Sequence, residues 1–300
     1  MTYNSLSQDT EIALINQLAP FLDNKSFIDI GAEKGVFALT MLKLGMSGSL
    51  FEPMEKHHSV LQELTDRYSG VNLYKCAVTD IDATQMFNVA TDIDGRELDY
   101  YHSLQKASAP GIFTHSKSFE VECRSLQSLV ERGEIPSTLG VLKTDTEGND
   151  LNVLRGLGPL RPEIVICEYF THGLYGGWSE AAPESIIEYM RGLDYRMFLV
   201  TKRIGDLEFI GVNTALYHER QWGNLFFFRD DFYKKAKSTI AECVFSNEGE
   251  LSERFNKILA GLEEKEKVIQ QLLLERSASV PAKTAEKGFF ARIFDLNRRT

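Results

Sequence analysis

Short apolar runs alternate with amphipathic segments between residues 26 and 78, and this alternation limits the possible folds more than any other feature of the sequence. The runs "SFIDI", "GSLFEP" and "VNLYKCAV" each have the length of a buried strand, and a segment with helical spacing follows each of the first two. Strands separated by helices predict a parallel sheet with helices on both faces. We therefore expect an α/β fold with a mostly parallel sheet.

The same alternation continues through the rest of the main domain. A helix is expected over residues 8–19, and further strands over "TLGVLKTD", "PEIVICEYF", "RMFLVTK", "DLEFIG" and "GNLFFFRDD". The closely spaced last strands predict an antiparallel edge on the sheet. Between residues 79 and 122 the pattern changes to short strand-like pieces around a polar loop, which indicates an insertion over one edge of the sheet.

Composition shifts after about Asp231, and we expect three parts: a main domain over residues 1–231, a helical extension over 232–276, and a linker with a basic amphipathic tail over 277–300. Apolar residues at alternating four-three spacing in the extension fit a short coiled coil, and fit equally well a lone helix packed on the domain. They are Leu251, Phe255, Ile258, Leu262, Ile269 and Leu272. The tail has the composition to dock on a partner protein or a membrane surface, although a frayed terminus is the simpler expectation.

Charge and cysteine usage exclude several classes of protein. A net charge of −10 argues against a general nucleic-acid-binding protein, because phosphate contacts need clustered lysine and arginine. The 4 cysteines are widely separated and form no CxxC pair, which favours free thiols in a reducing compartment. No apolar run reaches membrane-spanning length, and the amino terminus lacks the features of a secretion signal. We therefore expect a cytoplasmic protein.

Small and acidic residues follow the strands of the predicted sheet, at the edge where parallel sheets bind their ligands. Asp29, Gly31 and Gly35 follow the first strand, and Glu52 follows the second strand about twenty residues later. A carboxylate at that distance from a glycine loop is placed to accept hydrogen bonds from both ribose hydroxyls of an adenosine. The residues after the remaining strands are Cys76 and Ala77, then Asp145, Glu147 and Asp150, and finally Glu168, Tyr169 and His172.

The glycine loop lacks the GxGxxG spacing that supports a dinucleotide. Glu33 stands two residues after Gly31, and its carboxylate would repel a pyrophosphate. Asp29 and Glu33 instead suit a ligand with positive charge. S-adenosylmethionine combines a sulfonium, an ammonium and an adenosine, so it is the expected cofactor, and a dinucleotide oxidoreductase is disfavoured.

Six segments of the chain occur in an order that resembles one enzyme family. They are "FIDIGAEKGVFA", "LFEP", "CAVTD", "RSLQSLV", "VLKTDTEGNDLNVLRGL" and "EIVICEY". Together they resemble the FkbM family of S-adenosylmethionine-dependent methyltransferases over roughly residues 27–170. The fourth-strand motif, similar to L-K-I-D-V-E-G-x-E, is the distinctive part. The chain departs from the family pattern at Glu33, where Asn is common, and at Asn149–Asp150, where a small residue and Glu are usual.

This resemblance implies a class I methyltransferase fold, with a seven-stranded, mostly parallel sheet whose last strand is antiparallel. It also implies methylation of a hydroxyl oxygen on a sugar, glycan or natural-product acceptor. The expected cofactor-binding residues are Asp29, Gly31, Ala32, Gly35, Glu52, Pro53, Cys76, Ala77 and Asp145, and the expected acceptor-binding residues are Tyr101, His102, Ser103 and Glu168. The alternative is an inactive scaffold that assembles with glycan-biosynthesis partners, or with a second copy, through its C-terminal helix.

An alcohol is a poor nucleophile, so we expect a positioned base to assist an in-line methyl transfer. Asp145 is the first candidate because it ends the fourth strand beside the expected methyl position, although orienting the cofactor or capping a helix would equally explain it. The weaker candidates for the base are Glu147, His172 and His102. Magnesium bound by Asp145, Glu147 and Asp150 is the less favoured mechanism, because no further spaced oxygen ligands are evident, and we expect no metal.

Overall fold

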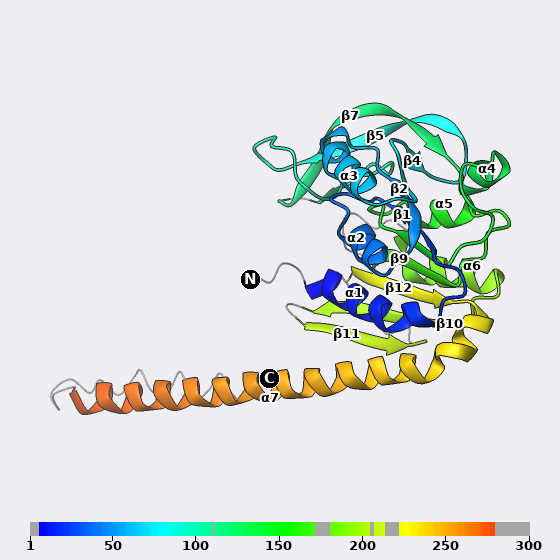
Figure 1. Cartoon of the computed structure of the whole chain (residues 1–300). Coiled ribbons are helices and arrows are strands. Elements are labelled where there is room, and N and C mark those ends of the chain that lie inside the picture. The colour runs from blue at the N-terminus through cyan, green and yellow to red at the C-terminus, as the bar shows by residue number, and fades with distance from the viewer. Residues whose placement is uncertain (1–5, 110, 172–180, 205–206, 214–221, 280–300) are drawn as a thin grey trace. The chain divides into compact units, whose positions relative to one another are not determined.

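The computed structural model describes residues 6–109, 111–171, 181–204, 207–213 and 222–279 (Figure 1). Its centre is a sheet whose strands follow the order β11-β10-β12-β9-β8-β1-β2-β3. Their bounds are β1 (Ser26–Ile30), β2 (Ser47–Phe51), β3 (Val71–Tyr74), β8 (Val141–Thr144), β9 (Ile164–Phe170), β10 (Met197–Ile204), β11 (Leu207–Val212) and β12 (Trp222–Phe228). This mixed α/β sheet confirms the predicted fold class.

The strand pairings show where the sheet can bind a ligand. Strands β3, β2, β1, β8 and β9 are parallel, and β12 lies antiparallel between β9 and β10. The strand order reverses between β1 and β8, which is the point at which open α/β sheets bind ligands. The expected count of seven strands is wrong by one in the described chain. The antiparallel hairpin of β10 and β11 extends the edge by an eighth strand.

Helices cover both faces of this sheet (Figure 1). They are α1 (Leu6–Leu18), the short 3-10 turn η1 (Ala19–Phe21), α2 (Val36–Lys43), α3 (Glu55–Arg67), α4 (Leu126–Glu131), α5 (Asp150–Arg155), α6 (Pro183–Gly192) and the first turns of α7 (Asp230–Ser279). One apolar core joins the sheet to α1, α2, α3 and the start of α7, and a second joins it to α4, α5 and α6. Successive side chains of β1 alternate between these cores: Phe27 belongs to the first, and Ile28 to the second.

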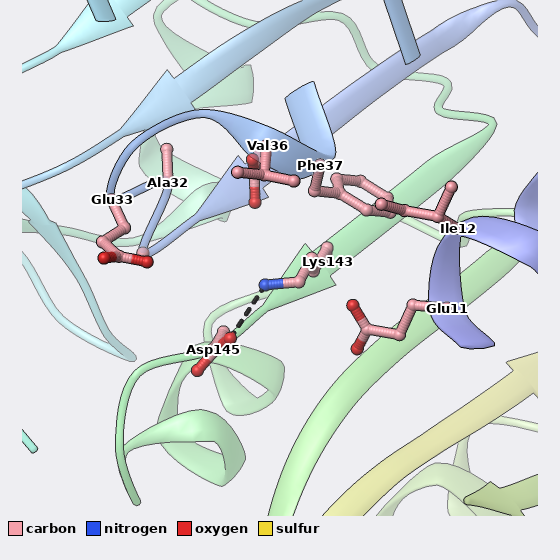
Figure 2. A pocket seen from close by; sticks show the side chains of 10 residues that line it. Glu11, Ile12, Ala32, Glu33, Val36, Phe37, Lys143 and Asp145 are labelled. Carbon is pink, nitrogen blue, oxygen red and sulfur yellow. Dashed lines mark hydrogen bonds and ion pairs between the residues drawn. The ribbon is translucent and has the colours of Figure 1, made fainter. Parts of the chain in front are cut away.

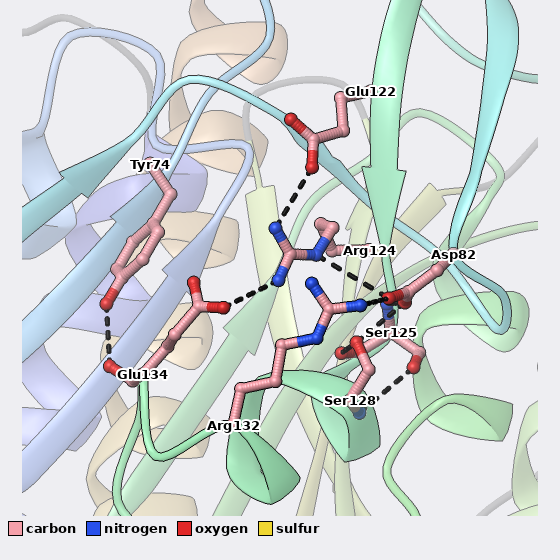
Figure 3. Close-up of polar contacts among 8 residues, drawn as sticks. All are labelled: Tyr74, Asp82, Glu122, Arg124, Ser125, Ser128, Arg132 and Glu134. Atoms are coloured by element: carbon pink, nitrogen blue, oxygen red, sulfur yellow. Dashed lines mark hydrogen bonds and ion pairs between the residues drawn. The ribbon is translucent and has the colours of Figure 1, made fainter.

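The expected insertion forms a second, small sheet. Its strands are β4 (Ala77–Val78), β5 (Ala83–Thr91), β6 (Ser108–Ala109) and β7 (Phe113–Arg124). Charged contacts join the end of β7 to the region of α4 (Figure 3). The Arg124 guanidinium donates to Glu122 at 2.9 Å and to Glu134 at 2.7 Å, and Arg132 donates to Asp82 at 2.8 Å. This Arg124 network holds the small sheet beside the main domain.

Helix α7 begins within the main domain. Its first turns bury Phe232, Ala236, Ile240 and Val244 in the core shared with α1 and α2. The chain divides into the compact units Met1–Glu248 and Gly249–Thr300, so the first unit extends past the boundary expected at residue 231. None of the described helices is long and apolar enough to cross a membrane.

Candidate functional site

The glycine loop after β1 approaches the end of β8. Gly31 has a φ of +75°, and a Cβ at this position would lie 1.9 Å from the Asp145 carbonyl oxygen. Gly35 has a φ of +73°, and a Cβ there would lie 2.4 Å from the side chain of Leu64 on α3. Internal packing therefore requires both glycines, and the loop is fixed against the point where the strand order reverses.

A small open pocket lies beside this loop (Figure 2). It is lined by Glu11, Ile12, Asp29, Gly31, Ala32, Glu33, Val36, Phe37, Lys143 and Asp145. Lys143 is the neighbour of Asp29 across the β1–β8 pairing, and its Nζ donates to Asp145 Oδ2 at 3.0 Å. Although burial opposes it, the charges of Asp145, Glu11 and Asp29 raise the pKa of Lys143. The ammonium therefore stays charged among the carboxylates of the pocket.

The electrostatics of this pocket favour a cationic ligand. Within the described part of the chain, neither carboxylate oxygen of Asp29 has a hydrogen-bond partner, and the residue is 1% exposed. Burial raises the pKa of Asp29 to about 6, while the nearby Lys143 opposes the rise. Four carboxylates line the pocket beside one lysine, which leaves an excess of negative charge. A ligand with an ammonium or sulfonium group offsets that excess.

Glu52 ties the glycine loop to the end of β2. Its Oε2 accepts from the backbone N–H of Glu33 at 2.9 Å, and its Oε1 accepts from that of Met54 at 2.8 Å. Burial raises the pKa of Glu52 to about 7. Each carboxylate oxygen can accept a second hydrogen bond, so two hydroxyl groups can still bind there. Pro53 is half-buried beside Glu52, whereas Cys76 and Ala77 are buried after β3.

Three carboxylates converge at the ends of β8 and β9: Asp145, Glu147 and Glu168. One oxygen from each lies within 4.8 Å of the others, and the three are called the carboxylate cluster below. Glu147 has a left-handed backbone, with a φ of 53°, and its Oε1 accepts from the backbone N–H of Tyr101 at 3.1 Å. Asp150 instead accepts from Thr144 Oγ1 at 2.9 Å and begins α5.

Burial and mutual repulsion disfavour the charged forms in the carboxylate cluster. They raise the pKa of Glu147 to about 8, with burial as the larger cause and Asp145 as the next. The pKa of Glu168 lies well above its ordinary value for the same reasons, since Asp145 and Glu147 are both nearby. The buried Oε2 atoms of Glu147 and Glu168 have no hydrogen-bond partner. Perturbed carboxylates in a shared site are a common mark of function.

The loop that contains three of the four predicted acceptor residues, Tyr101, His102 and Ser103, is hydrogen-bonded to the turn after β8 that carries Glu147. The Tyr101 ring stacks on Phe113, with centroids 4.7 Å apart, and Ser103 Oγ donates to the Thr146 carbonyl at 3.1 Å. His102 Nδ1 accepts from the Ala90 N–H at 3.0 Å, so Nε2 carries the proton toward the Leu98 carbonyl at 2.8 Å. Lys56 Nζ on α3 also lies 3.1 Å from Nε2, so both ring nitrogens are engaged by the protein.

The electrostatics of His102 agree with a positioning role. Burial, with the charge of Lys56, lowers the pKa of His102 to about 4, so the ring is neutral at ordinary pH. The geometry leaves its nitrogens no free direction toward a substrate, and the ring instead joins the loop to the backbone of β5 at Ala90. His172, the other histidine among the expected bases, lies outside the described residues.

Two charged residues of the pocket are absent from the sequence predictions. Lys143 occupies a buried strand, where a lysine is unusual enough to have been a signal. Glu11 belongs to α1, which lies outside every motif quoted above. The helical spacing of α1 gives no sign that Glu11 lies across the pocket from Lys143 (Figure 2).

Comparisons with known proteins give the chain its family. It is 25% identical over 159 residues to Methyltransferase 1 of Beauveria bassiana (strain ARSEF 2860), a match that covers 47% of the chain and 61% of that relative. A solved rRNA methylase from Streptococcus thermophilus is similar at 10% identity, with a TM-score of 0.37 and coverage of 76% and 98% of the two chains. A precorrin-6y C5,15-methyltransferase from Geobacter metallireducens is similar at 8% identity, with the same TM-score and coverage of 76% and 93%.

These two structural similarities are too distant to carry an argument about function. The family whose description is "Methyltransferase FkbM domain" matches residues 29–197, which is more than half of the chain. That segment contains the glycine loop, Glu52 and the whole carboxylate cluster. The chain therefore belongs to the FkbM methyltransferase family, and its cofactor is S-adenosylmethionine.

Proposed function

We propose that this protein transfers a methyl group from S-adenosylmethionine to a hydroxyl oxygen of a sugar, glycan or natural-product acceptor. The observation that carries the proposal is the position of the carboxylate cluster. It stands at the ends of β8 and β9, and its member Asp145 also lines the negative pocket beside the glycine loop. A cationic methyl donor and a group that activates an alcohol can therefore meet at one point.

The residues of the pocket fit the cofactor. The unpartnered, buried oxygens of Asp29 suit its positive charge, and Glu52 can accept from its ribose hydroxyls. Pro53, Cys76 and Ala77, which follow β2 and β3, are our candidates for enclosing the adenine. When bound, S-adenosylmethionine would supply a methyl group on a positively charged sulfur; the acceptor oxygen would take that methyl group, and S-adenosylhomocysteine would be the leaving group.

Asp145 is our candidate for the group that accepts the hydroxyl proton. Its side chain is 39% exposed, whereas Glu168 is buried, so an acceptor can reach Asp145 from solvent. Lys143 orients its carboxylate through the 3.0 Å hydrogen bond. A positioned base of this kind contributes about 10²–10⁴-fold to the rate.

The loop around Tyr101 is our candidate for acceptor recognition. Glu147 accepts from the backbone N–H of Tyr101, and the Tyr101 ring stacks on Phe113. These contacts give one rigid aromatic surface beside the carboxylate cluster. His102 and Ser103 secure the loop through bonds to the main chain. Sugar rings commonly pack on such aromatic faces, whose apolar area suits the ring C–H groups.

A second candidate role is assembly through α7. Val268, Ile269 and Leu272 are each more than half exposed on this helix. An apolar stripe of this kind suits a partner helix, and either a second copy or a glycan-biosynthesis protein would supply one. The solution mass of the chain with and without residues 249–300 tests this role, because an unchanged oligomeric state would exclude self-association through α7.

Two measurements test the proposed methyl transfer. Calorimetric titration of the full chain with S-adenosylmethionine should show one bound molecule, and Glu52→Ala should weaken the binding. Formation of S-adenosylhomocysteine should then depend on a hydroxylated acceptor drawn from a panel of sugars, glycans and polyketide alcohols. A cofactor that binds but is never consumed with any acceptor would favour the scaffold instead.

A further inference from the structure

The carboxylate cluster is a direct product of strand register. Lys143 and Thr144 pair with Ile166 and Cys167 across β8 and β9, so the next step of the register places Asp145 alongside Glu168. The turn after β8 then brings Glu147 back to the same place through its left-handed backbone. One oxygen from each of the three carboxylates lies within 4.8 Å of the others.

Glu168 makes this cluster unusual among groups of acidic residues. It is 8% exposed, and its Oε2 is buried without a hydrogen-bond partner. The Oε2 of Glu147, which belongs to the same group, is also buried and unpartnered. Buried carboxylate oxygens are normally paired with donors, since leaving them unpaired is costly. Two such atoms in one cluster therefore indicate a missing positive ligand.

The protein supplies little positive charge to the cluster. Lys143 forms an ion pair with Asp145 through Oδ2, at 3.0 Å. Among the described residues, no lysine or arginine forms an ion pair with Glu147 or Glu168. One ammonium thus faces three carboxylates, and it stands beside only one of them.

We propose that Asp145, Glu147 and Glu168 bind a divalent cation of the oxygen-preferring class, Mg²⁺ or Mn²⁺. All the protein ligands are carboxylate oxygens, which select these ions over zinc or copper. Three protein ligands leave coordination positions for water or for an acceptor hydroxyl. The site differs from the less favoured magnesium group of the sequence prediction, because Glu168 replaces Asp150. Asp150 Oδ1 accepts from Thr144 and its Oδ2 is buried without a partner, but Asp150 does not belong to the group of oxygens that lie within 4.8 Å of one another.

The purpose of the cation follows from the acceptor chemistry, and this part rests on the proposed function. An acceptor hydroxyl that reaches the cation would be more acidic, and its proton would pass to solvent as the oxygen takes the methyl group and S-adenosylhomocysteine leaves. With the cation bound, Asp145 would serve as a ligand and the cation would replace it as the activating group, whereas without the cation Asp145 keeps the role of base given above.

Direct titration of the full chain with Mn²⁺ tests the site without cofactor or acceptor. After removal of metal by a chelator and dialysis, calorimetry or Mn²⁺ electron paramagnetic resonance should show one ion bound per chain. Glu168→Gln and Glu147→Gln should each weaken binding by more than about tenfold, because each removes a ligand. Glu122→Gln, which changes an exposed carboxylate of the Arg124 network, should bind as the unaltered protein does.

Equal binding by the unaltered protein and both cluster variants would overturn the proposal, and so would the absence of binding at roughly millimolar Mn²⁺. Circular dichroism establishes whether each variant folds. Glu147→Gln, which lies in a turn, decides the question if Glu168→Gln does not fold. Because the titration contains no acceptor, bound Mn²⁺ with no methyl transfer would count against the proposed function alone. Undiminished turnover in chelator, with no Mn²⁺ bound, would count against the site alone.

Discussion

Two groups of acidic residues in this protein have similar composition and opposite character. Around Arg124, the carboxylates Asp82, Glu122 and Glu134 meet two guanidinium groups (Figure 3). In the carboxylate cluster, three acids meet one lysine, and two buried oxygens have no partner.

The difference shows which of the two groups serves the fold. The Arg124 network satisfies its carboxylates within the chain and joins two parts of the domain. The carboxylate cluster leaves interactions unmade at the edge where α/β sheets bind ligands. Buried polar groups that cost stability and have no compensating partner within the fold are typical of a functional site.

The largest expected effect is on catalysis at the carboxylate cluster. Asp145→Asn should lower kcat by about 10²–10⁴-fold, because the amide neither accepts a proton nor serves as an anionic ligand. Asp194→Asn is the matched control, since Asp194 is exposed and pairs only with Arg196 in the same turn. Steady-state rates of S-adenosylhomocysteine formation measure both variants. Equal rates for the two would remove the functional distinction between the carboxylate cluster and other acids.

The next largest effect is on the stability of the folded protein, at the Arg124 network. Arg124→Ala should lower the free energy of unfolding by about 1–2 kcal/mol, because the well-buried guanidinium serves several carboxylates. Arg132→Ala should cost less than about 1 kcal/mol, since its side chain is 54% exposed and serves Asp82 alone. Urea unfolding measures both. A larger loss for Arg132→Ala would show that the network does not depend on Arg124.

A pH dependence of cofactor binding follows from Glu52. Burial raises its pKa to about 7, and only its ionised form accepts from both ribose hydroxyls. Cofactor affinity should therefore fall up to about tenfold per pH unit as the pH drops below 7. The stability of the free protein should change in the opposite sense, because a raised carboxyl pKa makes stability fall as pH rises from about 4.5 through 7. Titrations from pH 5 to pH 8 compare the two, and Glu52→Gln should weaken both trends, leaving the part that comes from the raised pKa values of Asp29 and Glu147.

The smallest expected effect is a gain in stability. With metal removed, Glu168→Gln should raise the free energy of unfolding by about 1 kcal/mol at neutral pH, because burial and the neighbouring carboxylates raise the pKa of Glu168 and the fold no longer has to oppose its ionisation. Glu122→Gln should give no gain, since that carboxylate is already paired with Arg124. Thermal unfolding in chelator compares them. A clear loss of stability in Glu168→Gln would mean that the Glu168 carboxylate has partners within the fold.

The sequence predicts the sheet and the ends of its strands well, because hydrophobic periodicity and strand-end glycines report local structure. It places Asp29, Gly31 and Glu52 at the correct edge, and it identifies 79–122 as an insertion. The reason assigned to the glycines changes, however. Gly31 and Gly35 are required by Asp145 and by α3, respectively, before any ligand is considered.

Residues that meet only through tertiary structure are the ones that sequence reasoning misplaces. Glu168 joins Asp145 and Glu147 through the register of β9, whereas Asp150, which is nearer in sequence, turns away to Thr144. His102 has the chemistry of a base, but the fold uses both of its nitrogens to hold a loop. Spacing along the chain carries none of this information.

The most direct measurement follows the methyl group itself. S-adenosylmethionine labelled with ¹³C at the methyl carbon is incubated with the protein and an acceptor that is turned over, and the product is observed by NMR. The proposed function predicts a new signal in the methoxy region, and loss of that signal in Asp145→Asn. A label that appears as an N-methyl or C-methyl group would contradict hydroxyl methylation, and transfer that persists in Asp145→Asn would contradict the role of the carboxylate cluster.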